Sequence, residues 1–190
     1  MNITFIGNCQ KVSLCFYFQQ LLNSSDYNIC YIVSNKEFIS NLEDWSDKCI
    51  NKITNECEAI QRIKDSDIII YRDFRIETSK YSNTTTLKKI KKISCKLINI
   101  PYISLGNAHC DYSIKKLINE ENIHNVDIKV SDILYKFQHT NIKLMLSLTH
   151  PTTFLFMEIV KNICTLLNLE FFTEEQYNKF LENENYMKLP

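Results

Sequence analysis

Glycine is the residue that this chain of 190 residues most clearly lacks, since only Gly7 and Gly106 occur in it. Glycine adopts positive φ angles and allows close approach of the backbone to a ligand, because it has no Cβ atom. A chain that nearly avoids glycine is expected to keep it where one of these properties is needed. Both glycines therefore mark candidate positions for a binding site.

The chain also lacks an excess of charge of either sign. It contains 22 Lys and Arg residues and 22 Asp and Glu residues, so its net charge at pH 7 is zero. A nucleic-acid-binding domain usually carries a basic surface, and we expect no nucleic-acid partner. No apolar run has the length of a membrane span, and polar residues interrupt the first apolar stretch, so we expect no signal peptide. We expect no membrane association and a cytoplasmic location.

Cysteine is abundant, but the spacing of the cysteines lacks any C-x-x-C pair. Eight cysteines are present, and several fall within the helices and strands expected below. Such a distribution is typical of reduced thiols in a cytosol-like compartment, and not of a secreted disulfide framework. The spacing does not indicate a zinc site either, so we expect no metal.

Apolar runs and helical spacings alternate along the chain, which predicts an α/β fold. We expect a three-layer α/β/α arrangement with a mainly parallel central sheet, built as a single domain over residues 1–190 that could continue beyond Pro190. Residues 81–86 are expected to form a polar, mobile stretch. The expected strands are 3–6, 29–33, 67–71, 96–100 and 142–148, and the main expected helices are 11–22, 55–64, 87–93, 111–120, 127–137, 151–169 and 173–183. Asn55 with Glu58, and Thr173 with Gln176, have the spacing of a capping box at a helix start.

Cys9 lies at the expected turn from the first strand to the first helix, two residues after Gly7. The unpaired N–H groups and the positive dipole end of a helix N-terminus favour a thiolate, which is the nucleophilic form of cysteine. The same N–H groups could hold an oxyanion. The alternative is that Cys9 is a small buried residue without a chemical role.

Arg72 and Arg75 follow the expected strand 67–71, and Tyr71 ends that strand. Ligands of open parallel sheets bind beyond the carboxyl ends of the strands, and the planar guanidinium group suits phosphate. We therefore expect these three residues to bind a phosphate-bearing cofactor, although a surface ion pair with a nearby carboxylate is the alternative. Residues 106–109 and His150 also follow expected strands, so the sequence predicts one site at one edge of the sheet.

Three short motifs occur in an order that resembles the WcbI-type polysaccharide-biosynthesis family. They are Gly-Asn-Cys-Gln at residues 7–10, the Pro…Gly…His stretch at 101–111, and Thr-His-Pro at 149–151. Cys110 and Thr149 differ from the family pattern, which has proline and asparagine at these places. The family comprises coenzyme A-dependent acetyltransferases of capsule gene clusters and has relatives in giant DNA viruses. An acetyltransferase domain of a giant-virus amino-sugar enzyme, located in the host cytoplasm, is one possibility that the resemblance implies.

The resemblance implies acetyl-CoA as the acyl donor and a sugar or nucleotide sugar as the acceptor, with no metal. His150 would act as the base toward Cys9 or toward the acceptor. Cys9 either carries the acetyl group or only lines the site, and both routes stay open. The residues expected to bind the oxyanion or the substrate are Gly7, Asn8, Gln10, Gly106, Asn107, His109 and Asp111.

The layout also resembles the SGNH hydrolases, with Cys9 in the place of their serine. That superfamily has an aspartate three residues before the histidine, where this chain has Ser147; Asp111 or Asp73 could orient a histidine instead. His109 competes with His150 for the role of base. An SGNH-like esterase or deacetylase and a non-catalytic glycan- or nucleotide-binding domain are therefore the alternatives to an acetyltransferase, and the sheet could be SGNH-hydrolase-like or Rossmann-like.

Overall fold

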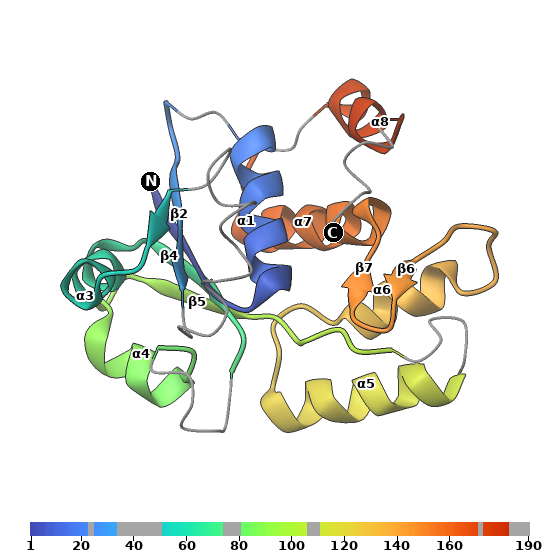
Figure 1. The fold of residues 1–190 in the computed structure, drawn as a ribbon, viewed down its shortest axis with the longest axis horizontal. Coiled ribbons are helices and arrows are strands. Elements are labelled where there is room, and N and C mark those ends of the chain that lie inside the picture. Colours follow the sequence, from blue (N-terminus) through green and yellow to red (C-terminus); the bar gives the residue numbers. More distant parts are fainter. Residues whose placement is uncertain (23–24, 34–50, 74–80, 106–110, 171–172, 183–190) are drawn as a thin grey trace. The chain divides into compact units, whose positions relative to one another are not determined.

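The computed structural model describes residues 1–22, 25–33, 51–73, 81–105, 111–170 and 173–182 (Figure 1). The chain divides into two compact units, Met1–Ile100 and Pro101–Pro190. Each unit is described separately below. Expected features within residues 34–50, 74–80 and 106–110 lie outside the described residues, and they include the predicted site residues Arg75, Gly106, Asn107 and His109.

The first unit contains a five-stranded parallel sheet with the strand order β3-β2-β1-β4-β5. This confirms the predicted α/β fold, and the order matches the first five strands of a doubly wound, Rossmann-type sheet. The elements are β1 (Asn2–Gly7), α1 (Cys9–Leu21), β2 (Asn28–Val33), β3 (Lys52–Ile53), α3 (Glu56–Asp65), β4 (Ile68–Tyr71), α4 (Thr84–Ile90) and β5 (Lys96–Asn99).

Helices cover both faces of this sheet (Figure 1). Alternate residues of β1 point to opposite faces, as they do in any strand. Phe5 packs edge-to-face on Phe18 of α1, with 5.1 Å between the ring centroids. Ile6 belongs to an apolar cluster with Ile63 of α3 and Leu87 of α4. The first unit therefore has the predicted three layers, with α1 on one face and α3 and α4 on the other.

Asparagine side chains begin both helices of the second face. The Asn55 side chain accepts hydrogen bonds from the N–H groups of Cys57 and Glu58, as its capping position predicts. Asn83 accepts in the same way from Thr85 and Thr86. The helix expected over residues 87–93 therefore begins three residues earlier, at Thr84, because Asn83 caps it ahead of the first apolar residue.

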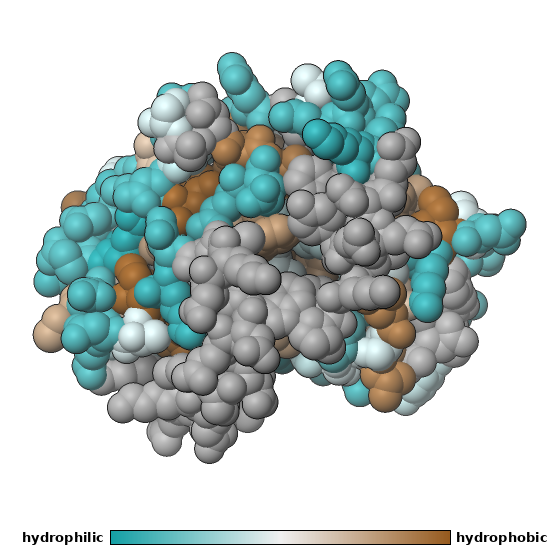
Figure 2. Space-filling view, turned by 45° about the horizontal axis from the view of Figure 1, so that its top comes forward, coloured by the Kyte–Doolittle hydropathy of each residue, from teal (hydrophilic) through white to brown (hydrophobic). Residues whose placement is uncertain are grey.

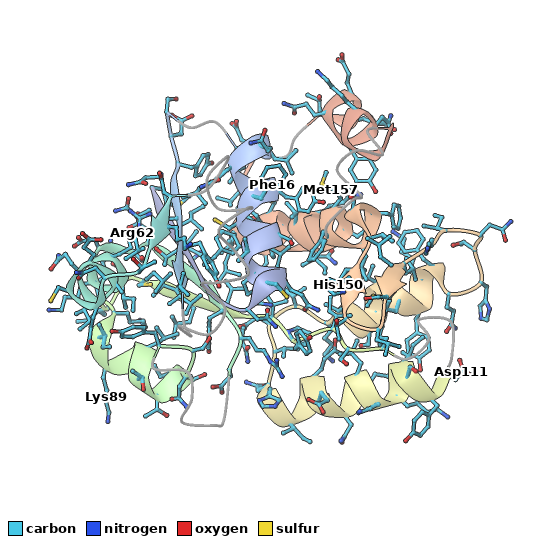
Figure 3. All side chains as sticks on the ribbon, in the orientation of Figure 1. Phe16, Arg62, Lys89, Asp111, His150 and Met157 are labelled. Atoms are coloured by element: carbon cyan, nitrogen blue, oxygen red, sulfur yellow. The ribbon has the colours of Figure 1, made fainter. Side chains whose placement is uncertain are left out.

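Arg62 connects α3 to strands β1 and β2 through hydrogen bonds. Its Nε donates to Thr4 Oγ1 at 3.0 Å and its Nη2 donates to the carbonyl oxygens of Ile3 and Asn28. Figure 3 shows Arg62 extending from α3 toward the sheet. This arginine stabilises the fold because its donors are used by the backbone and by a buried hydroxyl.

The second unit is mostly helical. A two-stranded antiparallel sheet of β6 and β7 pairs Ser147 with His150. The elements are α5 (Asp111–His124), α6 (Val130–Phe137), β6 (Met145–Ser147), β7 (His150–Pro151), α7 (Thr153–Leu167) and α8 (Glu174–Glu182).

Two expectations for this unit are wrong. The expected strand 142–148 does not join the parallel sheet, because residues 148–149 turn the chain back so that β6 pairs with β7. The expected helix 151–169 begins at Thr153, because Thr152 caps it: the Thr152 hydroxyl accepts from the N–H of Leu155 at 3.3 Å. Pro151 therefore lies in β7 and not in the first turn of the helix.

The capping box predicted for the last helix is confirmed. The N–H of Thr173 donates to Gln176 Oε1 at 2.8 Å, and the N–H of Gln176 donates to Thr173 Oγ1 at 3.2 Å. Glu121 of α5 caps the N-terminus of α6, because its buried carboxylate accepts hydrogen bonds from both the N–H and the hydroxyl of Ser131. Burial raises the pKa of Glu121, and the bonds from Ser131 oppose that rise.

Candidate functional site

The carboxyl ends of β1 and β4 form the centre of the candidate site in the first unit. These strands are neighbours, with Ile6 opposite Tyr71. The chain passes from β1 to β2 and β3 on one side of β1, and from β4 to β5 on the other side, so this is the point where the strand order reverses. Ligands of doubly wound sheets bind at such a point. Residues 7–9 and Arg72 therefore lie at the carboxyl ends of two adjacent strands, as the sequence predicted.

Gly7 has a φ angle of 151°, which side chains of L-residues rarely adopt. A Cβ atom at this position would lie 2.7 Å from Cγ of Lys11. The Gly7 carbonyl oxygen accepts a hydrogen bond of 2.5 Å from the buried Tyr31 hydroxyl. Both the backbone angle and the neighbouring side chain thus require glycine where the first strand meets α1.

Asn8 occupies the N-cap position of α1 but does not cap it with its side chain. Only 8% of Asn8 is exposed, and its Oδ1 atom has no hydrogen-bond partner among the described residues. Buried acceptors are almost always satisfied in folded proteins, and leaving one unmet is unfavourable. An N–H or O–H group outside the described residues would meet this need, and the binding role of Asn8 stays a prediction.

Cys9 is the first residue of α1 and is partly exposed. Burial raises the pKa of its thiol, and this outweighs the backbone N–H groups of Gln10 and Cys9 and the charge of Lys11, which lower it. The expectation of a thiol with a lowered pKa is therefore wrong. The predicted influences of the helix N-terminus are present, but desolvation of the thiolate is stronger.

Lys11 is the residue of this site that the sequence reasoning missed. Gln10 and Lys11 are both buried, with 3% and 1% of their surfaces exposed. Burial first, and the nearby Arg72 second, lower the pKa of Lys11 to about 7, while Cys9 raises it. The spacing indicates only the position of Lys11, which stands four residues after Gly7 so that its side chain lies over the preceding turn, and no local signal indicates its burial.

Tyr71, which ends β4, and the two residues that follow it differ in their surroundings. Arg72 is partly exposed. Tyr71 is 3% exposed, and its hydroxyl lies 2.7 Å from the Thr84 hydroxyl at the start of α4. Asp73 accepts from the N–H of Thr84 at 3.2 Å, and its own N–H donates to Asn99 Oδ1. Tyr71 and Asp73 therefore stabilise the junction of β4, α4 and β5, and a cofactor role for Tyr71 stays a prediction.

His150 belongs to the second unit, within β7. Its Nδ1 atom lies 2.6 Å from the Ser147 hydroxyl oxygen and 3.4 Å from that of Thr149. Ser147 thus contacts the imidazole from the place at which the SGNH pattern has an aspartate. A serine hydroxyl that accepts from Nδ1–H leaves Nε2 unprotonated and able to accept a proton. Figure 3 labels His150 on this hairpin.

Backbone hydrogen bonds connect the hairpin that carries His150 to neighbouring residues of the second unit. The carbonyl oxygen of Leu148 accepts from the N–H of Leu105 at 2.7 Å, and the N–H of Thr152 donates to Leu144. Asp111 begins α5 and is exposed (Figure 3). Because β7 is not a strand of the parallel sheet, the argument that His150 follows a strand of the sheet's common edge is wrong. The roles of His150 and Asp111 stay predictions.

Within the described part of the chain, no group of three or more His, Cys, Asp and Glu side chains is arranged to hold a metal ion. Among the same residues, no helix combines the length and the apolar character that crossing a membrane requires. Hydrophilic side chains cover most of the coloured surface in Figure 2.

Comparison with known proteins supports the fold. No protein-family model matches the chain, and no curated protein matches it. Among solved structures, the chain is similar to WcbI, described as a novel polysaccharide biosynthesis enzyme, with a TM-score of 0.61 and 12% sequence identity over 89% of this chain and 70% of that one. That structure is the native protein without a disulfide bond between coenzyme A and one of its cysteines. The predicted resemblance to WcbI is thus confirmed for the fold.

Proposed function

We propose that this protein is an acetyl-CoA-dependent acetyltransferase that acts on a sugar, in particular on the amino group of an amino sugar or nucleotide-amino sugar used for surface glycans. The observation that carries the proposal is the position of Cys9. It lies on the first turn of α1, at the point where the strand order reverses, in a fold similar to that of WcbI. The description of that structure names both coenzyme A and a cysteine.

The reaction transfers the acetyl group from sulfur to the acceptor. The acceptor nitrogen attacks the thioester carbonyl, and a base takes the proton that this nitrogen loses. The C–S bond of the tetrahedral intermediate then breaks while the base returns the proton to sulfur, so that coenzyme A leaves as the thiol. His150 is the proposed base, with Ser147 at its Nδ1 atom. The N–H groups of Cys9 and Gln10 are the proposed donors to the oxyanion.

The raised pKa of Cys9 favours one of the two routes. A thiol whose pKa lies above its ordinary value is mostly protonated at neutral pH, and the protonated form is a poor nucleophile. We therefore propose direct attack of the acceptor on the thioester, with Cys9 lining the site. The unmet acceptor of Asn8 would receive an amide N–H of the pantetheine arm or a hydroxyl group of the sugar.

The test is thiol release from acetyl-CoA, measured with and without a panel of UDP- and dTDP-amino sugars. We expect release that depends on the acceptor, that His150→Ala lowers at least about 100-fold, and that Cys9→Ala largely retains. The matched controls are His139→Ala and Cys57→Ala, which change an exposed histidine of the second unit and an exposed cysteine of α3.

Three results would change the proposal. Loss of activity in Cys9→Ala, together with trapping of acetyl-enzyme, would replace direct attack by the acyl-cysteine route. Full activity of His150→Ala would remove His150 as the base. Wild-type protein that releases no thiol with any acceptor, but releases acetate from acetylated sugars without coenzyme A, would establish the esterase alternative.

A further inference from the structure

The side chain of Tyr31, on β2, reaches the carboxyl end of the neighbouring strand β1. In the parallel pairing of these strands Tyr31 lies opposite Phe5, and Gly7 lies two residues further along β1. Side chains of a strand alternate between the two faces of the sheet and lean along the strand direction, so Tyr31 shares a face with Phe5 and Gly7. The Tyr31 hydroxyl donates a hydrogen bond of 2.5 Å to the Gly7 carbonyl oxygen. A side chain of β2 therefore restrains the backbone at the end of β1.

The Gly7–Asn8 peptide needs such a restraint because a glycine precedes it. Glycine populates a wider range of backbone angles than other residues, so the peptide that follows it rotates more freely. A residue with a Cβ atom would narrow this range, but that atom would lie 2.7 Å from Lys11 Cγ. The hydrogen bond from Tyr31 thus supplies a restraint that a side chain at position 7 could not.

The same peptide leads directly into α1. A trans peptide holds its N–H and C=O groups in opposite directions, so the Asn8 N–H points away from the Tyr31 hydroxyl. The Asn8 carbonyl oxygen accepts from the N–H groups of Lys11 at 2.9 Å and Val12 at 3.2 Å, which are backbone hydrogen bonds of the first turn of α1. The orientation of the Gly7–Asn8 peptide therefore determines how this turn begins, and Cys9 is its first residue.

Tyr31 is itself fixed in place and stays a hydrogen-bond donor. Only 2% of it is exposed, and its backbone N–H donates to the carbonyl oxygen of Asn51, next to β3, at 3.0 Å. Burial raises the pKa of the Tyr31 hydroxyl, and the nearby Cys9 and Cys15 add to this rise, so the phenol keeps its proton at neutral pH. The hydroxyl is therefore a fixed donor, and not an acid or a base of a reaction.

We propose that Tyr31 is a positioning residue of the candidate site: its hydroxyl fixes the Gly7–Asn8 peptide and, through it, the direction of the first N–H groups of α1. The inference rests on the proposed function for the reaction that these groups serve, in which they bind the oxyanion. Donors to a transition state are effective only when neighbouring residues hold them in place beforehand. Tyr31 acts through the backbone and contacts no reacting atom.

The alternative is that Tyr31 only stabilises the fold, since buried hydroxyl groups are almost always hydrogen-bonded. Ser66 provides the matched control. It is fully buried just before β4, at the amino end of the same sheet, and its hydroxyl lies 2.7 Å from Thr4 Oγ1 and donates to the Arg62 carbonyl oxygen at 2.7 Å. Tyr31→Phe and Ser66→Ala each remove a buried hydroxyl, but only Tyr31→Phe releases the peptide that begins α1.

The first measurement is amide hydrogen exchange of Lys11 and Val12, followed by NMR in the wild type and in both variants. The N–H groups of these residues bind the Asn8 carbonyl oxygen, so their exchange reports opening of the first turn. We expect exchange about fivefold faster in Tyr31→Phe, because the loss of a buried hydrogen bond favours local opening. Exchange in Ser66→Ala should equal that of the wild type.

The second measurement is kcat and KM of acetyl transfer at a temperature at which all three proteins are folded. Misdirected donors weaken the binding of the transition state more than that of the substrate. Tyr31→Phe should therefore lower kcat about tenfold and change KM for acetyl-CoA less than about twofold. Ser66→Ala should retain both constants, because a loss of stability alone changes neither in the folded protein.

Unchanged exchange in Tyr31→Phe overturns the proposal, and so does faster exchange with an unchanged kcat. If Tyr31→Phe does not fold, 3-fluorotyrosine at position 31 takes its place. Its more acidic hydroxyl is a stronger donor, so exchange of Lys11 and Val12 should become slower, and unchanged exchange again overturns the proposal. Wild-type protein without acetyl transfer would remove the proposed function, whereas faster exchange in Tyr31→Phe would still support Tyr31 as the residue that positions the turn.

Discussion

Two buried charged residues, one in each unit, have opposite surroundings. Glu121 of α5 is 2% exposed, and its carboxylate meets the first N–H groups of α6 and the Ser131 hydroxyl. Lys11 of α1 is 1% exposed, and the strongest charge acting on it is the like charge of Arg72. Glu121 is matched by donors of its own unit, which is typical of a residue that stabilises a fold. Lys11 is instead removed from water near a like charge, and both influences lower its pKa.

The largest expected effect that tests this difference is the pH dependence of stability at Lys11. Its pKa is about 7 in the folded protein against an ordinary 10.5, so between these values the unfolded chain binds a proton that the folded chain does not. The free energy of unfolding must then rise with pH in this window. From pH 7 to pH 10 we expect the wild type to gain about 3 to 4 kcal/mol relative to Lys11→Met.

Urea denaturation of both proteins at the two pH values measures this gain. Below pH 7 both states of the wild type bind the proton, so the difference between wild type and Lys11→Met should become constant. Parallel pH profiles of the two proteins would show that folding leaves the pKa of Lys11 unchanged, and the contrast with Glu121 would disappear.

Removal of the Glu121 carboxylate should destabilise the protein without affecting ligand binding. We expect Glu121→Ala to lower the free energy of unfolding by about 2 to 3 kcal/mol, because the N–H and hydroxyl of Ser131 lose their acceptor in a buried place. Glu121→Gln retains an acceptor and should cost less than about 1 kcal/mol. Chemical denaturation checks both, and equal losses for the two variants would mean that packing, and not the helix cap, is what Glu121 provides.

Gly7 should be coupled to Lys11 and not only to its own backbone angle. We expect Gly7→Ala to lower the free energy of unfolding by about 2 kcal/mol, through the φ angle of 151° and the contact of the new Cβ atom with Lys11 Cγ. In a Lys11→Ala background, which lacks this Cγ atom, the loss should fall to about 1 kcal/mol. A double-mutant cycle measures the coupling, and strictly additive effects would separate Gly7 from the Lys11 position.

The smallest stability effect is expected at Ser147, whose contact with His150 is proposed to serve activity. Ser147 is exposed, so Ser147→Ala should change the free energy of unfolding by less than about 0.5 kcal/mol. If Ser147 positions the His150 ring, the same variant should lower kcat of acetyl transfer about tenfold, and Ser147→Asp should restore it.

Nitrogen NMR of the His150 ring, compared between wild type and Ser147→Ala, reports the tautomer directly. A tautomer with the proton on Nδ1 supports the positioning role. A proton on Nε2 in the wild type would contradict it, because the base would then already be protonated at the required atom.

Much of the first unit could be predicted from its sequence, because short apolar runs separated by amphipathic stretches define parallel strands and their crossover helices. The strand 67–71 and the cap at Asn55 were located from such local patterns. The start of α4 was not, because apolar spacing begins only at Leu87 while Asn83 sets the N-terminus. The second unit was harder, since the segment 142–148 has the apolar character of a strand but pairs with its own continuation.

The candidate site likewise contains residues that could be predicted from the sequence and residues that could not. Position in the chain predicted Gly7, Asn8 and Cys9, because glycine scarcity and the strand-to-helix turn are visible in sequence. The raised pKa of Cys9 could not be predicted, because it depends on how much of the thiol is covered by other elements. Lys11 was missed because lysine is usually exposed, and nothing local shows that the cation is buried.

The sequence by itself therefore determined the alternation of strands and helices, the caps that begin several helices, and the place of the Gly-Asn-Cys-Gln turn at the end of the first strand. These features depend on neighbours in the chain. Only the tertiary structure decided that β4 follows β1 in the sheet, that Arg72 thereby approaches Lys11, and that Cys9 is desolvated. Charge interaction and burial depend on distances between residues far apart in sequence, and those distances exist only once the sheet has formed.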